Sequence, residues 1–136
     1  MNVVIDTNIL VSGLYSRNGA PAKVLSLMFN GLLVPCYDFR ILDEYQEVLF
    51  RDKFHFSKPH VKTLLGWIQP QGRSLVAPPL GMAFVDEDDK KFYELAKGFG
   101  IYLVAGNKKH YPEDDLVVSV NEFLEILSKS SLLPLL

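Results

Sequence analysis

The chain has 136 residues, of which 49% are hydrophobic and 12% are aromatic, enough for one sizeable core and a single domain over residues 1–136. Its formal net charge of −2 excludes a protein that holds nucleic acid by bulk positive charge, so any contact with nucleic acid must be local. The single cysteine, Cys36, excludes an internal disulfide and a multi-cysteine zinc site, and its apolar neighbours predict a buried thiol.

Strands and helices are predicted to alternate along the chain. The predicted strands cover residues 2–7, 32–36, 73–78, 101–106 and 116–118. The predicted helices cover residues 19–31, 38–51, 57–68, 88–100 and 119–129, and their expected start and stop residues are Pro21, Gly31, Asp38, Ser57, Gly98, Gly100 and Ser119. This order implies parallel crossovers and therefore an α/β fold with a helix-covered sheet.

Polar residues follow several of these strands. Asp6, Thr7 and Asn8 come after the first strand, residues 86–89 (DEDD) after the third, and residues 105–110 (AGNKKH) after the fourth. Ligands of parallel sheets bind outside the carboxyl ends of the strands, so we expect these side chains to converge on one edge of the sheet.

Helical geometry separates the acids of residues 38–51. The buried stripe is predicted to consist of Ile41, Leu42, Tyr45, Val48 and Leu49. At about 100° per residue, Asp43 and Glu47 lie roughly 160° from the centre of this stripe, whereas Glu44 lies about 100° away. Glu44 is therefore expected at the border, where it can reach a cleft, and Glu47 is expected to face water.

The run of acids at residues 86–89 has two interpretations. Acids at a helix start can cap it, and Asp86 is best placed for this. Capping needs only one or two acids, however, and crowding more of them costs repulsion. Asp88 and Asp89 fall within roughly 50° of the centre of a stripe that contains Phe92, Leu95, Ala96 and Phe99, so both are expected to point toward the sheet.

Asp6, Glu44 and one or two of the acids at 86–89 would form an oxygen-only site, which suits Mg²⁺ or Mn²⁺. None of the three histidines is expected to bind metal. On a soluble α/β domain such ions commonly serve phosphoryl chemistry, and hydrolysis of a phosphodiester by water fits. The nearby cations Lys90, Lys91, Lys108, Lys109 and His110 are candidates for local phosphate contacts, although each of them can equally belong to a solvated face.

Other classes of protein are less well supported. The sequence contains neither G-x-x-x-x-G-K-[ST] nor G-x-G-x-x-G, so nucleotide-binding folds of those kinds lack support. The alternative that remains is a phosphate-receiving or catalytically silent binding module of the same architecture. A phosphate-receiving domain would carry an acid pair after the first strand, whereas here Asp6 stands alone.

Four blocks of the sequence, VVIDTNILVSGL, ILDEYQEVLFR, VDEDDKKFYELAKGFGIYLVAGNKKHYP and VVSVNEFLEIL, resemble the PIN-domain family, specifically prokaryotic proteins described as toxin components of toxin–antitoxin systems. The resemblance covers residues 2 to about 127. It implies a three-layer α/β/α sandwich around a central parallel sheet and an Mg²⁺- or Mn²⁺-dependent ribonuclease that acts on single-stranded RNA. It also implies a cognate antitoxin protein as partner.

The resemblance assigns roles to individual residues. Asp6, Glu44 and Asp89 match the catalytic, metal-binding acids, with Asp88 as a further ligand candidate. Thr7 matches a hydroxyl residue beside the first acid, and Asn8 is expected to brace the loop there. Many family members carry a fourth acid after the fourth strand, where this chain has Asn107; an amide oxygen can ligate Mg²⁺ but carries no charge, so a tightly held second metal is not expected.

Location and assembly follow from the two ends of the chain. The opening MNVVIDTN lacks the basic segment of a secretory signal, and no apolar run approaches the roughly 18 residues of a membrane span. We therefore expect a cytoplasmic protein without membrane contact. The apolar ending SSLLPLL is expected to pack on the body or on a second subunit, and a homodimer is the predicted assembly.

Overall fold

The computed structural model describes residues 1–130 and contains a five-stranded, fully parallel sheet with the strand order β3-β2-β1-β4-β5. Its strands are short and lie at β1 (Asn2–Ile5), β2 (Val34–Tyr37), β3 (Arg73–Ser74), β4 (Tyr102–Val104) and β5 (Val117–Val118). A strand overlaps each predicted range, but the strands are shorter than predicted: β1 ends at Ile5 rather than at residue 7, and β3 covers only Arg73–Ser74 of the predicted residues 73–78. The strand order reverses direction at β1, which pairs with β2 on one side and with β4 on the other.

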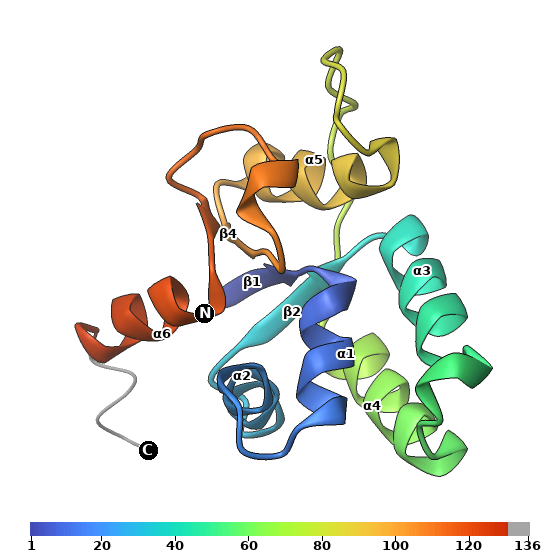
Figure 1. Cartoon of the computed structure of the whole chain (residues 1–136). Helices are drawn as coiled ribbons and strands as arrows, with labels where there is room; N and C mark the ends of the chain where they lie inside the picture. The colour runs from blue at the N-terminus through green and yellow to red at the C-terminus, as the bar shows by residue number, and fades with distance from the viewer. Residues whose placement is uncertain (131–136) are drawn as a thin grey trace.

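Six helices surround this sheet: α1 (Thr7–Tyr15), α2 (Ala20–Phe29), α3 (Phe39–Leu49), α4 (Lys58–Gln71), α5 (Lys90–Phe99) and α6 (Val120–Ser128). Right-handed crossovers place α1 to α4 on one face and α5 on the other, because the chain moves outward from β1 in opposite directions. Figure 1 shows α5 above the sheet and α1, α2 and α4 below it, and α6 packs against α2. The predicted three-layer α/β/α sandwich is confirmed.

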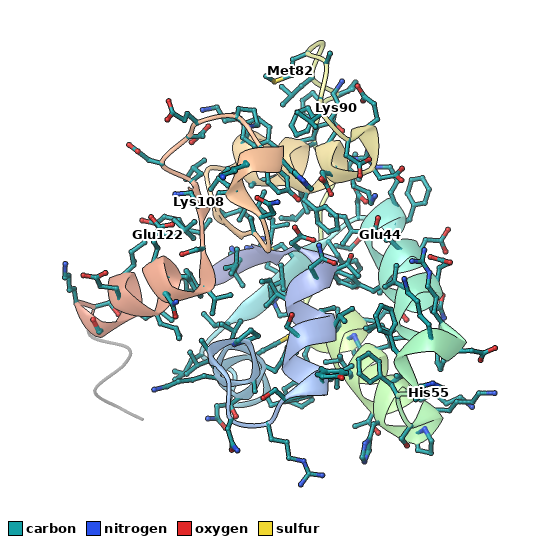
Figure 2. All side chains as sticks on the ribbon, in the orientation of Figure 1. Glu44, His55, Met82, Lys90, Lys108 and Glu122 are labelled. Carbon is teal, nitrogen blue, oxygen red and sulfur yellow. The ribbon has the colours of Figure 1, made fainter. Side chains whose placement is uncertain are left out.

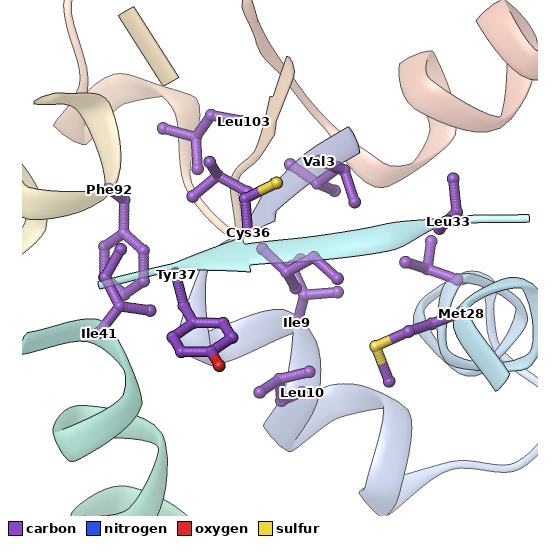
Figure 3. Close-up of a cluster of buried hydrophobic side chains, with 14 of the residues drawn as sticks. Val3, Ile9, Leu10, Met28, Leu33, Cys36, Tyr37, Ile41, Phe92 and Leu103 are labelled. Carbon is purple, nitrogen blue, oxygen red and sulfur yellow. The ribbon is translucent and has the colours of Figure 1, made fainter. Parts of the chain in front are cut away.

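The core lies on both faces of the central strands. Side chains pack on each side of β2, with Leu103 on one side and Ile9 and Leu10 on the other (Figure 3). Strands buried on both faces read as continuous apolar runs, which is why β1 consists of Asn2 followed by Val3, Val4 and Ile5. Cys36 is fully buried as predicted, and burial raises the pKa of its thiol.

Local sequence signals set most of the helix ends. The Asp38 carboxylate accepts a hydrogen bond from the Ile41 backbone N–H and begins α3, and Ser119 begins α6 with a complete capping box to Glu122. Gly100, in a left-handed conformation with φ of 65°, ends α5. These three caps confirm the predictions made for the same residues.

Helix α1 is absent from the sequence predictions, which treated the residues after Asp6 as a loop. Asp6 is instead the N-cap of α1, and its carboxylate accepts a hydrogen bond from the Asn8 backbone N–H. The strand therefore passes directly into the helix without a connecting loop. This abrupt junction fixes the Asp6 side chain at the carboxyl end of β1.

Three details of α5 differ from expectation. A short 3₁₀ turn, η2 (Glu87–Asp89), precedes the helix, so α5 begins at Lys90 rather than at residue 88. Gly98 lies within the helix and does not close it. Phe99, predicted to belong to the core stripe, is 45% exposed, because the helix ends at the next residue and its last turn faces solvent.

Residues 75–86 connect β3 to η2 and are fastened to α5 by a buried carboxylate. Glu94 is 4% exposed; its Oε2 accepts a hydrogen bond from the Leu80 backbone N–H at 2.6 Å, and its Oε1 accepts one from Arg40 at 3.0 Å. Arg40 also pairs with buried Asp38 at 2.7 Å. One ion network therefore joins the start of α3, the middle of α5 and the connecting segment.

No helix within residues 1–130 is long and apolar enough to cross a membrane. The apolar ending SSLLPLL, on which the predictions of tail packing and of a homodimer depend, lies outside the described residues except for Ser130. The homodimer therefore stays a prediction.

We expect Glu94→Ala to lower the free energy of unfolding by about 2–3 kcal/mol, because it leaves the Leu80 N–H and one face of the Arg40 guanidinium without their acceptor. Urea unfolding followed by circular dichroism measures this change. Glu47→Ala is the matched control, since Glu47 also pairs with an arginine but is exposed to solvent. Equal losses in the two variants would contradict the fastening role of Glu94.

Candidate active site

Asp6 is the centre of the site and is almost completely buried, with 4% of its surface exposed. Its Oδ1 accepts a hydrogen bond from the Asn8 N–H at 3.2 Å. Its Oδ2 accepts one from the Gly106 N–H at 3.4 Å and one from the Tyr111 hydroxyl at 3.1 Å. Donors from three separate parts of the chain therefore hold one carboxylate in place.

Glu44 reaches the same edge of the sheet from α3. The neighbouring Tyr45 is fully buried, and its hydroxyl donates to the Ile5 carbonyl at 2.5 Å, which sets the position of α3 against the end of β1. Glu44 then accepts a short hydrogen bond from the Thr7 hydroxyl through Oε2 and pairs with Lys91 at 2.7 Å through Oε1. Its side chain is 24% exposed, which confirms the predicted border position.

Glu47 behaves as predicted from the helix phase. Its side chain is 62% exposed and pairs with Arg51 one turn further along α3. Figure 2 shows Glu44 on the part of α3 nearest to α5. Helix α3 therefore turns Glu44 toward the cleft and Asp43 and Glu47 toward solvent.

The run of acids at 86–89 divides into three environments. Asp89 has a side chain that is 17% exposed and lies 3.4 Å from Nδ1 of His110. Asp86 caps η2 by accepting a hydrogen bond from the Asp88 N–H, which confirms its predicted capping role, although the capped element is the 3₁₀ turn. Asp88 is exposed, and its backbone carbonyl accepts a hydrogen bond from Lys91. Of the two acids expected to turn inward, only Asp89 is partly buried.

Asn107 lies after β4 but its side chain serves the local turn. It caps the 3₁₀ turn η3 (Lys108–His110), where its Oδ1 accepts a hydrogen bond from the Lys109 N–H, and its Nδ2 lies 3.3 Å from Nε2 of His110. His110 thus links Asn107 to Asp89. The contribution of Asn107 to metal binding stays a prediction.

Three of the lysines considered for phosphate contacts, Lys90, Lys108 and Lys109, lie on two elements, α5 and η3. Lys90 begins α5, and its ammonium lies 3.8 Å from Glu87. Lys108 pairs with Glu122 of α6 at 2.9 Å, and Figure 2 shows the two labels close together. Lys109 is exposed beside Lys108 on η3.

A close backbone approach holds the Asp6 loop against the β4 loop. A Cβ atom placed on Gly106 would lie 2.9 Å from the Cβ of Asn8, which is closer than real Cβ atoms approach. Only glycine fits there without a shift of α1. This contact brings the Gly106 N–H to Asp6, and the bracing role of Asn8 stays a prediction.

The acids perturb one another electrostatically. Burial raises the pKa of Asp6, the hydrogen bonds from Asn8, Gly106 and Tyr111 oppose this shift, and the charge of Glu44 adds to it. Burial, followed by the charges of Asp6 and Asp86, raises the pKa of Asp89 to about 6 from its ordinary value of 3.8. The fold therefore holds more negative charge at this edge than its own cations neutralise.

This donor set fits a divalent cation. The candidate ligands are carboxylate oxygens, which Mg²⁺ and Mn²⁺ prefer. Burial and, after it, the neighbouring acids disfavour the ionised form of Asp89, which a cation would stabilise. Among residues 1–130, no three His, Cys, Asp or Glu side chains already converge as a metal cluster. Asp6, Glu44 and Asp89 are the candidate ligands, and in this structure Glu44 is engaged by Lys91.

Sequence reasoning missed two parts of the site. Tyr111 was not considered, although it is a single aromatic residue within the polar stretch 107–115, a pattern that favours an inward-facing side chain. Lys91 was considered only as a possible phosphate contact, and nothing in its local sequence indicates a partner 47 residues away on another helix.

The fold and the site together define a parallel α/β domain with an acidic, oxygen-donor centre at the carboxyl edge of its sheet. The family model described as PIN domain matches residues 2–109, and the chain therefore belongs to the PIN-domain family. Searches among curated proteins and among solved structures returned no match. PIN domains are in general nucleases that use divalent metal ions.

We expect the metal-free protein to lose stability as pH rises from about 4 to about 6, because folded Asp89 keeps its proton up to about pH 6 whereas the unfolded chain releases it near its ordinary value. Asp89→Asn should flatten this part of the profile and leave the variant more stable than the wild type at pH 7. Urea unfolding in EDTA across this range measures both effects. If the stability of the wild type and of Asp89→Asn changes with pH in parallel, folding does not raise the pKa of Asp89.

Proposed function

We propose that this protein is an Mg²⁺- or Mn²⁺-dependent endoribonuclease that hydrolyses single-stranded RNA in the cytosol. One observation carries the proposal: Asp6, Glu44 and Asp89 come from three distant segments, and yet the charge of Glu44 contributes to the raised pKa of Asp6, and the charges of Asp6 and Glu44 contribute to the raised pKa of Asp89. The chain belongs to the PIN-domain family, whose members are typically metal-dependent nucleases.

The three acids differ in how the protein holds their carboxylates. Asp6 is rigid, since its donors leave it little freedom. Glu44 is held by Thr7 and by Lys91, and the second contact is an ion pair that can exchange for a cation. The pKa of Asp89 is raised to about 6, so its ionised form is disfavoured and a positive charge nearby would stabilise it. Asp88 and Asn107 are the remaining proposed ligands. Asp86 caps the 3₁₀ turn that carries Asp88 and Asp89.

A divalent cation at these acids would supply Lewis-acid activation of the phosphodiester and of the attacking water. The chain itself supplies orientation, because Asn8, Gly106 and Tyr111 fix Asp6 before any ligand arrives. Lys91 supplies a positive charge beside Glu44, and its ammonium is proposed to turn to a phosphate oxygen when Glu44 binds the cation. Lys90, Lys108 and Lys109 are proposed to hold flanking phosphates.

Cleavage of a labelled single-stranded RNA by purified protein, with Mn²⁺ or with EDTA, tests the proposal. Wild-type protein should cleave only with metal. Asp6→Asn and Glu44→Gln should each lower the rate by at least about 100-fold, because each removes a ligand charge while keeping the shape of the side chain.

Glu47→Gln is the matched control, since it removes an acid from the same helix as Glu44 but from the solvent side. Its cleavage rate should equal that of the wild type. Cleavage in EDTA, or no cleavage with any divalent metal, would contradict the proposal, and the second result would favour a catalytically silent binding module.

We further propose that the nuclease is the toxin of a toxin–antitoxin pair, on the basis of the four sequence blocks that resemble such toxins. Expression of the wild type in a bacterial host should then arrest growth, and Asp6→Asn should not. A protein encoded beside it should restore growth and bind the purified nuclease. Normal growth of cells that accumulate the active wild type would contradict the toxin role while leaving the nuclease proposal intact.

A further inference from the structure

The cleft that contains Glu44 continues along α3 to an exposed aromatic ring. This cleft has a volume of about 600 Å³ and lies between α3 and the start of α5. Its lining includes Phe39, Glu44, Arg51, Asp88, Lys90 and Lys91. Phe39 begins α3 and Glu44 lies five residues further on, so about 7.5 Å of helix axis separates them.

Phe39 presents its ring to solvent from a rigid base. Its exposure is 78%, although both of its neighbours are fixed by the buried ion network. Asp38 is 5% exposed and caps α3, and Arg40 bridges Asp38 and Glu94. The backbone that carries the ring is therefore held in place. Stacking of a ligand on the ring then costs little conformational entropy, because the backbone is already ordered.

The charges of the cleft favour a stacking contact over attraction by bulk positive charge as a source of RNA affinity. Acidic residues outnumber basic ones along its walls, and the whole chain has a net charge of −2. Arg40 and Arg51 are already engaged by acids of the protein. Attraction of phosphates by bulk positive charge is thus weak here, whereas stacking of a base on an aromatic ring does not depend on net charge.

We propose that Phe39 is a base-stacking residue for single-stranded RNA, holding a nucleobase one or two nucleotides from the phosphodiester at Asp6, Glu44 and Asp89. This inference rests on the proposed nuclease function and adds to it the path of the substrate: along α3, past Lys90 and Lys91, to Phe39. Every base has a face that can stack, so the contact binds the strand without selecting a sequence.

The first test compares RNA affinity and cleavage kinetics of Phe39 variants in Mn²⁺. Phe39→Ala should weaken binding of a fluorescein-labelled single-stranded RNA, measured by anisotropy, by about five-fold to a hundred-fold, the range expected for one stacked base. The loss should appear in KM more than in kcat and should change little with salt. Phe39→Trp should keep wild-type affinity, whereas Phe39→Leu, which is apolar but lacks an aromatic face, should lose most of it.

Tyr15→Ala is the matched control, because Tyr15 is equally exposed at 79% but ends α1 and does not line this cleft. It should bind RNA as the wild type does. Substrates with one abasic position near the cleaved bond give the second test: at the stacked position, wild type and Phe39→Ala should become equal.

The outcomes separate the two proposals. Absence of cleavage by the wild type would remove the nuclease function, and the anisotropy comparison would still decide the role of Phe39. Cleavage and binding that are unchanged in Phe39→Ala would overturn the stacking role while the nuclease function stands, and would point to a protein partner at this ring. The stacking role would also be overturned if Phe39→Ala bound every abasic substrate more weakly than the wild type by the same factor as intact RNA. The ring would then support the structure of the protein and would not contact a base.

Discussion

The site depends on the cost of keeping the Asp6 carboxylate in the interior at the end of β1. A buried acid needs donors, and here they come from the first turn of α1, from the loop after β4 and from the hydroxyl of Tyr111. Satisfying this one group therefore ties together segments up to 105 residues apart. The close contact of Gly106 with Asn8 serves the same requirement, because it brings the Gly106 N–H to the carboxylate.

Local signals in the sequence were sufficient to predict most of the fold. Asp38 and Ser119 begin helices because a side-chain acceptor beside free N–H groups is a local arrangement, and Gly100 ends one because its backbone conformation is local too. The border position of Glu44 followed from helix periodicity. Helix α1 was missed because Asp6 acts both as the end of a strand and as a helix cap, which leaves no turn residues between the two elements.

The remaining differences arise where tertiary packing changes a local pattern. Asp88 was placed by assuming about 100° per residue, but η2 is a 3₁₀ turn with about 120° per residue, so the phase of the acids differs from that of the helix that follows. In α5, Tyr93 and Glu94 are buried because residues 75–86 cover a second face of the helix, which periodicity alone does not reveal. The ion pair of Lys91 with Glu44 requires two helices to be adjacent and has no local sequence signal.

The segment 75–86 also divides the chain into two parts of different length, and both parts contribute strands to the same sheet. Figure 2 shows Met82 at the outer tip of this segment, far from the sheet, whereas Leu80 is fastened to Glu94. A backbone cut near Met82 would leave β1, β2 and β3 on one piece and β4 and β5 on the other, joined by the pairing of β1 with β4 and by the Arg40–Glu94 ion pair. Asp6 and Glu44 would belong to the first piece and Asp89 to the second. The fold is thus a natural candidate for a split protein, in which neither fragment carries a complete site and only reassembly restores it.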